Sequence, residues 1–460
     1  MTNPKDPEME FTIKQYSTMK FAAILRTCAI VLLLLTATLP AVAADKPNIL
    51  IIFTDDQGYA DIGCYGSPKN KTPRLDQLAM EGTRFTSFYS QTVCGPSRSA
   101  LLTGRQPIRS KGWGMPATEI TFAELIRQVD YQTACIGKWD VSNRKAIIDR
   151  MPNAQGFDYY FGALGANDGG RVMFHQNNDP AGSTRDMGSL TKLYTDKAIE
   201  FLKQRRDPEK PFVLYVAHTM MHTIIDASEG FRGKSAGGLY GDVVEEFDYQ
   251  TGRLLDTLDE LKLRDNTLVI YTSDNGPWNQ DKYTKKKKGH PEGSIFWGDA
   301  GPLRNGKGSP YEGGYRLPCI VRWPGKVPAE RVSPAIFATI DFMPTFANLA
   351  GFDVPDDRRI DGIDQTDLLL GKREVGRDHF YFGRAGVRQG RWKYLKPKAH
   401  FHGYAVEDDR PKIDELYDLQ TDLGERKNVA MSHPQKVAEL RELMLAIEGN
   451  DTLRPEDSQR

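Results

Sequence analysis

The sequence predicts an α/β fold, in which a mixed, largely parallel central sheet carries helices on both faces. Three apolar, β-branched runs bounded by turn residues have the character of buried parallel strands, at 48–53, 211–217 and 267–272. Helical patterns lie between and around these runs, at 73–80, 121–129 and 240–261. Strands that alternate with helices in this way are typical of such sheets.

The last part of the chain has a different pattern. Beyond about residue 341 the predicted strands become short, at 379–382, 386–388, 392–395 and 415–419, and a helical segment follows at 435–447. We therefore expect a larger domain over 45–345. A smaller α+β domain is expected over 346–460, with an antiparallel sheet and a terminal helix.

The N-terminus resembles a secretory signal peptide over residues 1–44. Lys20 and Arg26 precede an apolar run at 28–35, and small residues follow at 40–44. The polar residues before Met19 fit neither part, so we expect Met19 to be the true start. The apolar run is shorter than a membrane span. We expect a secreted or periplasmic protein without a stable membrane span after cleavage, an uncleaved anchor being the alternative.

Charge and cysteine content argue against two classes of protein, nucleic-acid-binding proteins and disulfide-rich scaffolds. Lys plus Arg equals Asp plus Glu at 61 each, so no overall field favours a nucleic acid as partner. The mature chain keeps four cysteines, Cys64, Cys94, Cys135 and Cys319. If Cys94 is reserved for chemistry, at most one disulfide can form among the others, and the sequence leaves open whether it does. The chain is therefore not a disulfide scaffold.

Polar residues follow each of the three predicted strands. Asp55 and Asp56 come after the first, His218 and His222 after the second, and Asp274-Asn275 after the third. A single group of this kind is best explained as a solvated turn. Three groups at the carboxyl ends of parallel strands indicate a site at that edge of the sheet. His218 alone is assigned a structural role.

The stretch CGPSRSALLTGR at 94–105 is an unusual setting for a cysteine. Its neighbours are turn formers, a hydroxyl and a cation, whereas buried cysteines usually lie among apolar residues. Pro96 suits the first turn of a helix. Cys94 is then expected at a helix N-terminus, where free N–H groups favour developing negative charge.

These residues resemble the C-x-P-S-R…L-T-G-R signature of type I sulfatases of the alkaline phosphatase superfamily. The motifs TDDQG, SDNG, GKW, LRNGKG and YEGG support the resemblance, which runs from about Lys46 to about Ala430. It implies an alkaline-phosphatase-like fold, with 45–345 as the catalytic domain. It also implies that a maturation enzyme oxidises Cys94 to formylglycine, whose hydrate attacks the sulfur of a sulfate ester.

The resemblance and the residue types together predict one metal ion per chain. The side chains of Asp55, Asp56, Asp274 and Asn275 form an all-oxygen ligand set, which suits Ca²⁺ or Mg²⁺ rather than zinc. In similar enzymes these positions hold Ca²⁺, which also contacts the modified cysteine, here Cys94. The cation would neutralise charge on the sulfate.

Further site residues follow from the resemblance. Arg98, one helical turn after Cys94, would reach the hydrate and the metal ligands. Lys138 in GKW and Lys307 in LRNGKG would bind sulfate oxygens. His222 would face the scissile oxygen and donate a proton to the leaving alcohol.

The chain departs from the family pattern at Asp140, which follows GKW where the family has histidine. In the family this histidine is thought to take a proton when sulfate leaves. Asp140 is either a substituted base, a neutral change in a working enzyme, or a mark of lost turnover. We favour the substituted base, because every other catalytic position is present.

The sequence thus predicts a sulfuric ester hydrolase acting on a sulfated carbohydrate or an aryl sulfate. One alternative is a phosphoester or phosphonate hydrolase of the same superfamily, because the fold and the metal site suit either anion. Another is a sulfate-ester-binding protein whose turnover is impaired by Asp140. The sugar, the position of its sulfate, endo or exo action and the oligomeric state do not follow from the sequence.

Overall fold

The computed structural model describes residues 46–278, 297–400 and 411–449. A ten-stranded sheet forms its centre, in the order β10-β2-β9-β8-β1-β7-β3-β4-β5-β6. Its strands are β1 Asn48–Thr54, β2 Thr83–Tyr89, β3 Gln132–Lys138, β4 Tyr159–Ala163, β5 Val172–Gln176, β6 Asp179–Thr184, β7 Phe212–Ala217, β8 Thr267–Ser273, β9 Arg316–Arg322 and β10 Arg331–Ala338.

The middle of this sheet is parallel. Strand β1 pairs in parallel with β7 and with β8, and β3 pairs in parallel with β7 and with β4. Antiparallel pairs occur farther out, where β9 joins β8 to β2 and where β5 joins β4 to β6. The predicted mixed, largely parallel sheet is confirmed.

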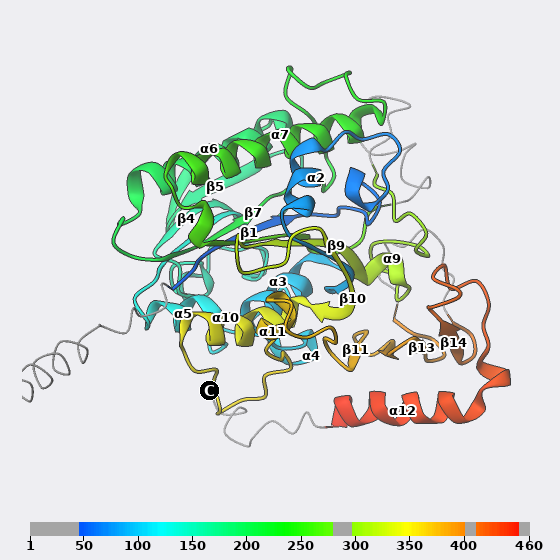
Figure 1. Cartoon of the computed structure of the whole chain (residues 1–460). Coiled ribbons are helices and arrows are strands. Elements are labelled where there is room, and N and C mark those ends of the chain that lie inside the picture. The colour runs from blue at the N-terminus through cyan, green and yellow to red at the C-terminus, as the bar shows by residue number, and fades with distance from the viewer. Residues whose placement is uncertain (1–45, 279–296, 401–410, 450–460) are drawn as a thin grey trace, which may run out of the picture. The chain divides into compact units, whose positions relative to one another are not determined.

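Helices cover both faces of the sheet (Figure 1). Strand β1 explains why: Leu50 and Ile52 pack into the core on one side, while Ile49, Ile51 and Phe53 pack into the core on the other. Side chains alternate along a strand, so a continuous apolar run needs cover on both faces. One face is covered by α2 Pro73–Met80, α6 Leu190–Glu200 and α7 Gly238–Glu260, and the other by α3 Cys94–Thr103, α5 Phe122–Arg127, α10 Phe342–Ala350 and α11 Thr366–Leu369.

A second sheet of four antiparallel strands lies in the C-terminal part of the chain. It has the order β11-β12-β13-β14, from β11 His379–Tyr381, β12 Gly386–Gln389, β13 Trp392–Leu395 and β14 Glu415–Asp418. Helix α12, Pro434–Gly449, packs on it through Val437, Leu440, Met444 and Ile447. The described residues also include two short α-helices, α4 Pro107–Ser110 and α9 Glu312–Tyr315, and several 3-10 turns.

Three expectations concern the chain as a whole. The expected domain boundary near residue 345 falls inside α10, whose Phe342 and Phe346 belong to a core of the large sheet; the division into two domains stays a prediction. The expected signal peptide and the start at Met19 lie outside the described residues. Within the described ranges, no helix has the length and apolar character needed to cross a membrane. Cys64, Cys94, Cys135 and Cys319 are free thiols.

Candidate active site and metal site

Two central strands bring the predicted carboxylates together. In the parallel pair of β1 and β8, Thr54 lies opposite Ser273, so the residues that follow each strand emerge side by side. The backbone N–H of Asp56 donates to Asp274 Oδ1 at 3.1 Å, and Asn275 Nδ2 donates to Asp56 Oδ1 at 2.7 Å. All of these side chains are buried.

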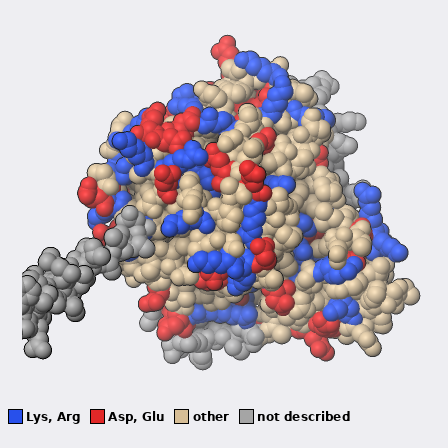
Figure 2. Space-filling view, in the orientation of Figure 1, with Lys and Arg blue, Asp and Glu red and all other residues tan. Residues whose placement is uncertain are grey.

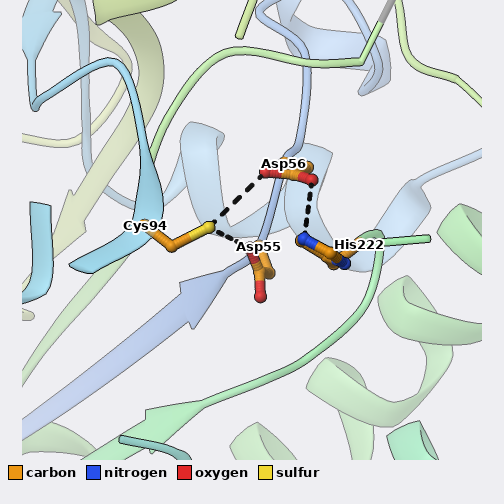
Figure 3. Close-up of side chains that lie close together, drawn as sticks. All are labelled: Asp55, Asp56, Cys94 and His222. Carbon is orange, nitrogen blue, oxygen red and sulfur yellow. Dashed lines mark hydrogen bonds and ion pairs between the residues drawn. The ribbon is translucent and has the colours of Figure 1, made fainter. Parts of the chain in front are cut away.

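Cys94 lies against this group from the other direction. Helix α3 begins at Cys94, as the sequence predicts, and Cys94 Sγ lies 3.3 Å from Asp55 Oδ1 and 3.9 Å from Asp56 Oδ1 (Figure 3). Gly95 is needed here, because a Cβ at that position would lie within 3 Å of the Trp113 ring. The indole of Trp113 therefore covers the start of α3.

The sequence predicts that the helix N-terminus favours negative charge at Cys94, but the surroundings raise the pKa of its thiol. Burial raises the pKa of the Cys94 thiol well above its ordinary value, and Asp274 and Asp55 raise it further. These effects outweigh any help from the helix N-terminus and from two nearby lysines. An unmodified thiolate is thus disfavoured at this position, and cysteine chemistry of the usual kind is poorly supported.

Two lysines from distant parts of the chain reach the carboxylates. Lys138, the last residue of β3, donates from Nζ to Asp55 Oδ2 at 2.6 Å. Lys307 donates from Nζ to Asp56 Oδ2 at 2.8 Å and lies 3.4 Å from Cys94 Sγ. Both ammonium groups thus lie close to Cys94 and to the carboxylates that follow β1.

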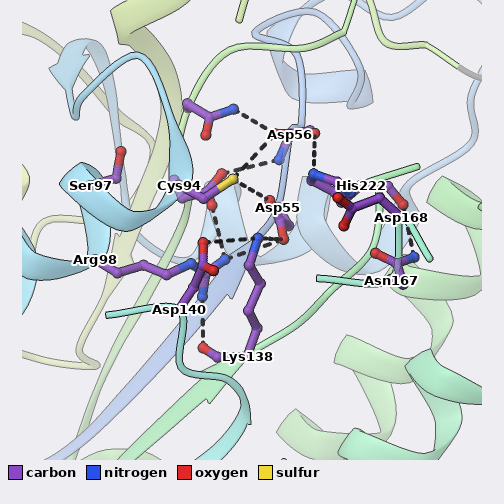
Figure 4. Close-up of polar contacts among 12 residues, drawn as sticks. Asp55, Asp56, Cys94, Ser97, Arg98, Lys138, Asp140, Asn167, Asp168 and His222 are labelled. Carbon is purple, nitrogen blue, oxygen red and sulfur yellow. Dashed lines mark hydrogen bonds and ion pairs between the residues drawn. The ribbon is translucent and has the colours of Figure 1, made fainter. Parts of the chain in front are cut away.

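Arg98 holds the same group from within α3. Its Nη2 donates to Asp274 Oδ2 at 2.9 Å. The same nitrogen lies 3.5 Å from Asp55 Oδ2, and Figure 4 shows Arg98 beside Asp55. Its Nη1 donates to the carbonyl of Lys138 at 3.0 Å. The guanidinium is fully buried and links the helix to both strand ends.

The carboxylates differ in their electrostatics although they are neighbours. Burial opposes ionisation of Asp55, but the charges around it, Lys138 first, hold the pKa of Asp55 well below its ordinary value. Burial, with Asp55 adding to it, raises the pKa of Asp274 to about 7 against the opposing effect of Arg98. A cation bound between them would favour the ionised form of both.

The two histidines after β7 have different surroundings. His222 lies with Nε2 3.7 Å from Asp56 Oδ2 and Nδ1 2.6 Å from the carbonyl of Thr223. Burial, followed by Lys307, lowers the pKa of His222 well below its ordinary value. His218 packs against Phe247 instead, with ring centroids 4.7 Å apart, and burial lowers its pKa to about 3. His218 is thus a core residue away from the carboxylates.

Asp140 is fully buried and held by three partners. Its Oδ1 accepts from Arg144 Nε at 2.8 Å, its Oδ2 accepts from Trp113 Nε1 at 3.0 Å, and Lys138 Nζ lies 3.6 Å away. The sequence analysis did not identify Trp113 or Arg144 as site residues. Arg144 lies in a turn with left-handed backbone and not in a helix, so its spacing from Asp140 carried no signal. Trp113 lies in a loop that carries no motif.

The residues fit a hard cation. One ligand atom each from Asp55, Asp56, Cys94 and His222 lies within 4.8 Å of the others. Asn275 Oδ1 is buried and has no hydrogen-bond partner among the described residues, although such atoms are rarely left unsatisfied. An oxygen-preferring cation would supply the missing partner and offset the carboxylate charges.

Comparison with known families decides the identity of this arrangement. The sulfatase family profile matches residues 47–352, which is more than half of the chain. The chain belongs to the sulfatase family. A second profile, the C-terminal region of N-sulphoglucosamine sulphohydrolase, matches residues 306–448. The sulfatase is therefore a sulfuric ester hydrolase.

Curated relatives and a solved structure agree with this. The sulfatase is 35% identical over 388 residues to an N-acetylgalactosamine-6-sulfatase of Canis lupus familiaris, covering 77% of this chain and 72% of the relative. It is 32% identical over 487 residues to an N-acetylgalactosamine-6-O-sulfatase of Bacteroides thetaiotaomicron, covering 88% and 93%. A solved structure from work on the metabolism of multiple glycosaminoglycans by the same bacterium has a TM-score of 0.77 and 29% identity, covering 88% of this chain and all of that one.

Proposed function

We propose that this sulfatase removes sulfate from a sulfated carbohydrate, with Cys94 matured to formylglycine and one bound Ca²⁺. The observation that carries the proposal is the convergence on Cys94 Sγ of Asp55 at 3.3 Å and Lys307 at 3.4 Å in a buried centre. Burial, Asp274 and Asp55 raise the pKa of the Cys94 thiol, so an unmodified thiolate is disfavoured there. The hydroxyl-bearing nucleophile is proposed on the resemblance of residues 94–105 to the sulfatase signature.

Formylglycine and Ca²⁺ would supply distinct chemistry at this site. Formylglycine, once formed and hydrated, supplies the hydroxyl that attacks sulfur. Ca²⁺, held by Asp55, Asp56, Asp274 and Asn275, supplies positive charge for the sulfate oxygens.

The chain's own residues would bind and orient the ester. Lys138 and Lys307 hold sulfate oxygens, since their ammonium groups already lie at the metal ligands. Arg98 keeps Asp274 and Asp55 in place. His222 would donate a proton from Nε2 to the leaving alcohol as an imidazolium, because its Nδ1 proton is held by the Thr223 carbonyl. The lowered pKa of His222 opposes this protonated form.

Asp140 would take the proton that the family's histidine is thought to take. Its position favours this role, because the carboxylate lies 3.6 Å from the sulfate-binding ammonium of Lys138. Both of its oxygens are engaged by donors, so positioning of Lys138 is the competing role.

The substrate class follows from the relatives and from export. The named relatives act on N-acetylgalactosamine 6-sulfate, so this sugar sulfate is the first substrate to test. A signal peptide over 1–44 would deliver the enzyme to the periplasm or outside the cell, where sulfated polysaccharides are met.

The decisive experiment starts with the mass of the tryptic peptide that carries Cys94, from protein made with the maturation enzyme. We expect a mass about 18 Da below that of the cysteine peptide, together with sulfate release from sulfated monosaccharides. Cys94→Ala is the control and should release none. A fully matured peptide with no release from any sulfate ester would contradict the proposal.

Two rivals predict different results with the same protein. A phosphoester or phosphonate hydrolase would cleave an aryl phosphate faster than the matching aryl sulfate. A binding protein would retain a sulfated sugar at equilibrium and release no product. Parallel assays of the two aryl esters, with a binding measurement, separate them.

A further inference from the structure

Arg144 bonds the buried carboxylate of Asp140, and its own side chain is partly exposed at the surface. Its Nε donates to Asp140 Oδ1 at 2.8 Å, and its Nη1 donates to Asp168 Oδ2 at 3.5 Å. The side chain of Asp140 is fully buried, whereas those of Arg144 and Asp168 are 41% and 44% exposed. Arg144 and Asp168 therefore form the outer end of a chain of ion pairs that begins at Lys138.

The position of Arg144 is fixed by its surroundings. A Cβ on Gly165 would lie 3.1 Å from both Cγ and Cδ of Arg144, so the stem lies directly against that glycine. The backbone is left-handed at Asp140, Asn143 and Arg144, with φ near 58°, 54° and 58°. Such conformations are costly for non-glycine residues and cluster at functional sites. The guanidinium is held in one place before any ligand binds.

Asp168 comes from the opposite side of the site. Its neighbour Asn167 donates from Nδ2 to the carbonyl of His222 at 3.0 Å and to that of Ile224 at 2.7 Å. Asp168 is thus tied to the segment that carries His222, beside which Figure 4 draws it. Arg144, in contrast, is tied to Asp140 on the Lys138 side. The pair therefore connects the turn after GKW to the segment that carries His222.

The free atoms of this pair are a donor and an acceptor. Among the described residues, nothing bonds Nη2 of Arg144 or Oδ1 of Asp168. The charge of the Arg144 guanidinium is balanced by the carboxylates of Asp140 and Asp168. Arg144 therefore has little net positive charge to attract an anion such as a second sulfate. Each hydroxyl of a sugar ring can donate and accept, so two adjacent hydroxyls can accept from Arg144 Nη2 and donate to Asp168 Oδ1.

We propose that Arg144 and Asp168 bind two neighbouring hydroxyls of the sugar that carries the scissile sulfate. This rests on the proposed function, since it assumes a sugar sulfate held by Lys138 and Lys307. Arg144 and Asp168 are not among the residues that would bind the sulfate. They would instead determine which sugar binds. An aryl sulfate has no such hydroxyls and does not use it.

The test compares a sulfated monosaccharide with an aryl sulfate in the matured enzyme. For Asp168→Ala we expect KM for the sugar sulfate to rise about tenfold or more, as expected for one hydrogen bond to a charged group, and to rise much less for the aryl sulfate. Asp168→Asn, which keeps the shape, should lie between Asp168→Ala and the wild type. Arg144→Ala should raise the KM for the sugar in the same way.

Combining Asp168→Ala with deoxy analogues of the sugar, in the manner of a double-mutant cycle, shows which hydroxyl Asp168 binds. Analogues of the sulfated sugar that each lack one hydroxyl should lose affinity in the wild type. One of them should lose little more in Asp168→Ala, because that contact is already absent. Arg74→Ala, from an exposed ion pair with Asp256 between α2 and α7, is the control for loss of a surface arginine.

Three results would overturn the proposal. The first is an equal rise in KM for the sugar sulfate and for the aryl sulfate, and the second is an unchanged KM for the sugar sulfate in Asp168→Ala. The third is a loss of affinity from Asp168→Ala that adds to the loss from every deoxy analogue. Failure of the proposed function is a separate observation, because the wild type itself would then release no sulfate from any sugar ester.

Discussion

Asp140 stands after GKW, where the resemblance to the family predicts a histidine. Its carboxylate accepts hydrogen bonds from Arg144 and Trp113 and lies near Lys138. A histidine could not accept two such donors at once, because a neutral imidazole has one acceptor nitrogen. Asp140 therefore makes a pair of contacts that a histidine could not make, and one of them is to Arg144, which we propose binds the sugar.

Replacement of Asp140 separates its two candidate roles. We expect Asp140→Ala to lower kcat by about 10²-fold or more, as for loss of a general base. Added formate or acetate should restore part of the activity if the carboxylate takes a proton. Asp149→Ala, an exposed acid nearby in the chain, should behave as the wild type. Loss of activity without rescue would assign Asp140 to positioning, and wild-type kcat would exclude both roles.

At the scale of elements, the C-terminal sheet is joined to the active-site loops by buried charges. Lys393 of β13 lies 3.0 Å from Glu312 Oε1 of α9 and 2.8 Å from Glu425 Oε1. Helix α9 in turn contacts the loop after Asn275, where the N–H of Gly276 donates to the carbonyl of Gly314 at 3.1 Å. One ammonium between two carboxylates makes this junction sensitive to pH.

The pH dependence of stability should report on Glu425. Burial raises the pKa of Glu425 from 4.5 to about 7, in spite of Lys393. A carboxyl with a raised pKa favours the folded state most below pH 4.5, and this contribution is lost as the pH rises through 7. We expect the wild type to lose on the order of 3 kcal/mol more than Glu425→Gln over that interval, at about 1.4 kcal/mol per pKa unit.

Urea unfolding at a series of pH values measures this difference. Glu439→Gln, an exposed position on α12, is the control and should follow the wild type. Parallel curves for the wild type and Glu425→Gln between pH 4.5 and 7 would contradict the expected titration.

How much the sequence predicts depends on the kind of element. The strands β1, β7 and β8 are continuous apolar runs, so their positions and the polar residues after them could be predicted. Strand β6, Asp-Pro-Ala-Gly-Ser-Thr, is exposed throughout most of its length and forms only because β5 pairs with it. Such a strand has no apolar pattern to detect.

The same distinction applies within the site. Asp55, Asp274 and Cys94 could be found because motifs carry them. Trp113 and Asn167 could not, because each lies in a loop and acts through a partner distant in the chain: Asp140 for Trp113, and His222 and Ile224 for Asn167. Loop positions of this kind depend on tertiary contacts that no local pattern encodes.

At the scale of the whole molecule, the metal site should contribute to stability as well as to catalysis. The residues proposed to hold the ion follow β1 and β8, at the centre of the large sheet, and Asn275 Oδ1 lacks a partner among the described residues. Several buried carboxylates in one place repel one another, and a bound cation removes that cost. A ligand that binds only the folded state stabilises it, by about 2.7 kcal/mol at a hundred times its Kd.

We therefore expect a chelator to lower both sulfatase activity and Tm, and added Ca²⁺ to restore both. Asn275→Ala should weaken the rise in Tm with Ca²⁺, because Asn275 Oδ1 has no hydrogen-bond partner among the described residues and would be a ligand. The variant also loses the hydrogen bonds that Nδ2 donates to Asp56 Oδ1 and to the carbonyl of Gly276, so the rise in Tm with Ca²⁺, and not the Tm of the chelated protein, is the readout. Thermal unfolding over a Ca²⁺ titration, with Mg²⁺ in parallel, measures the effect and the preference. Equal Tm with and without Ca²⁺ in the wild type would show that these oxygens do not hold the ion, and that their charge is balanced by Lys138, Lys307 and Arg98 alone.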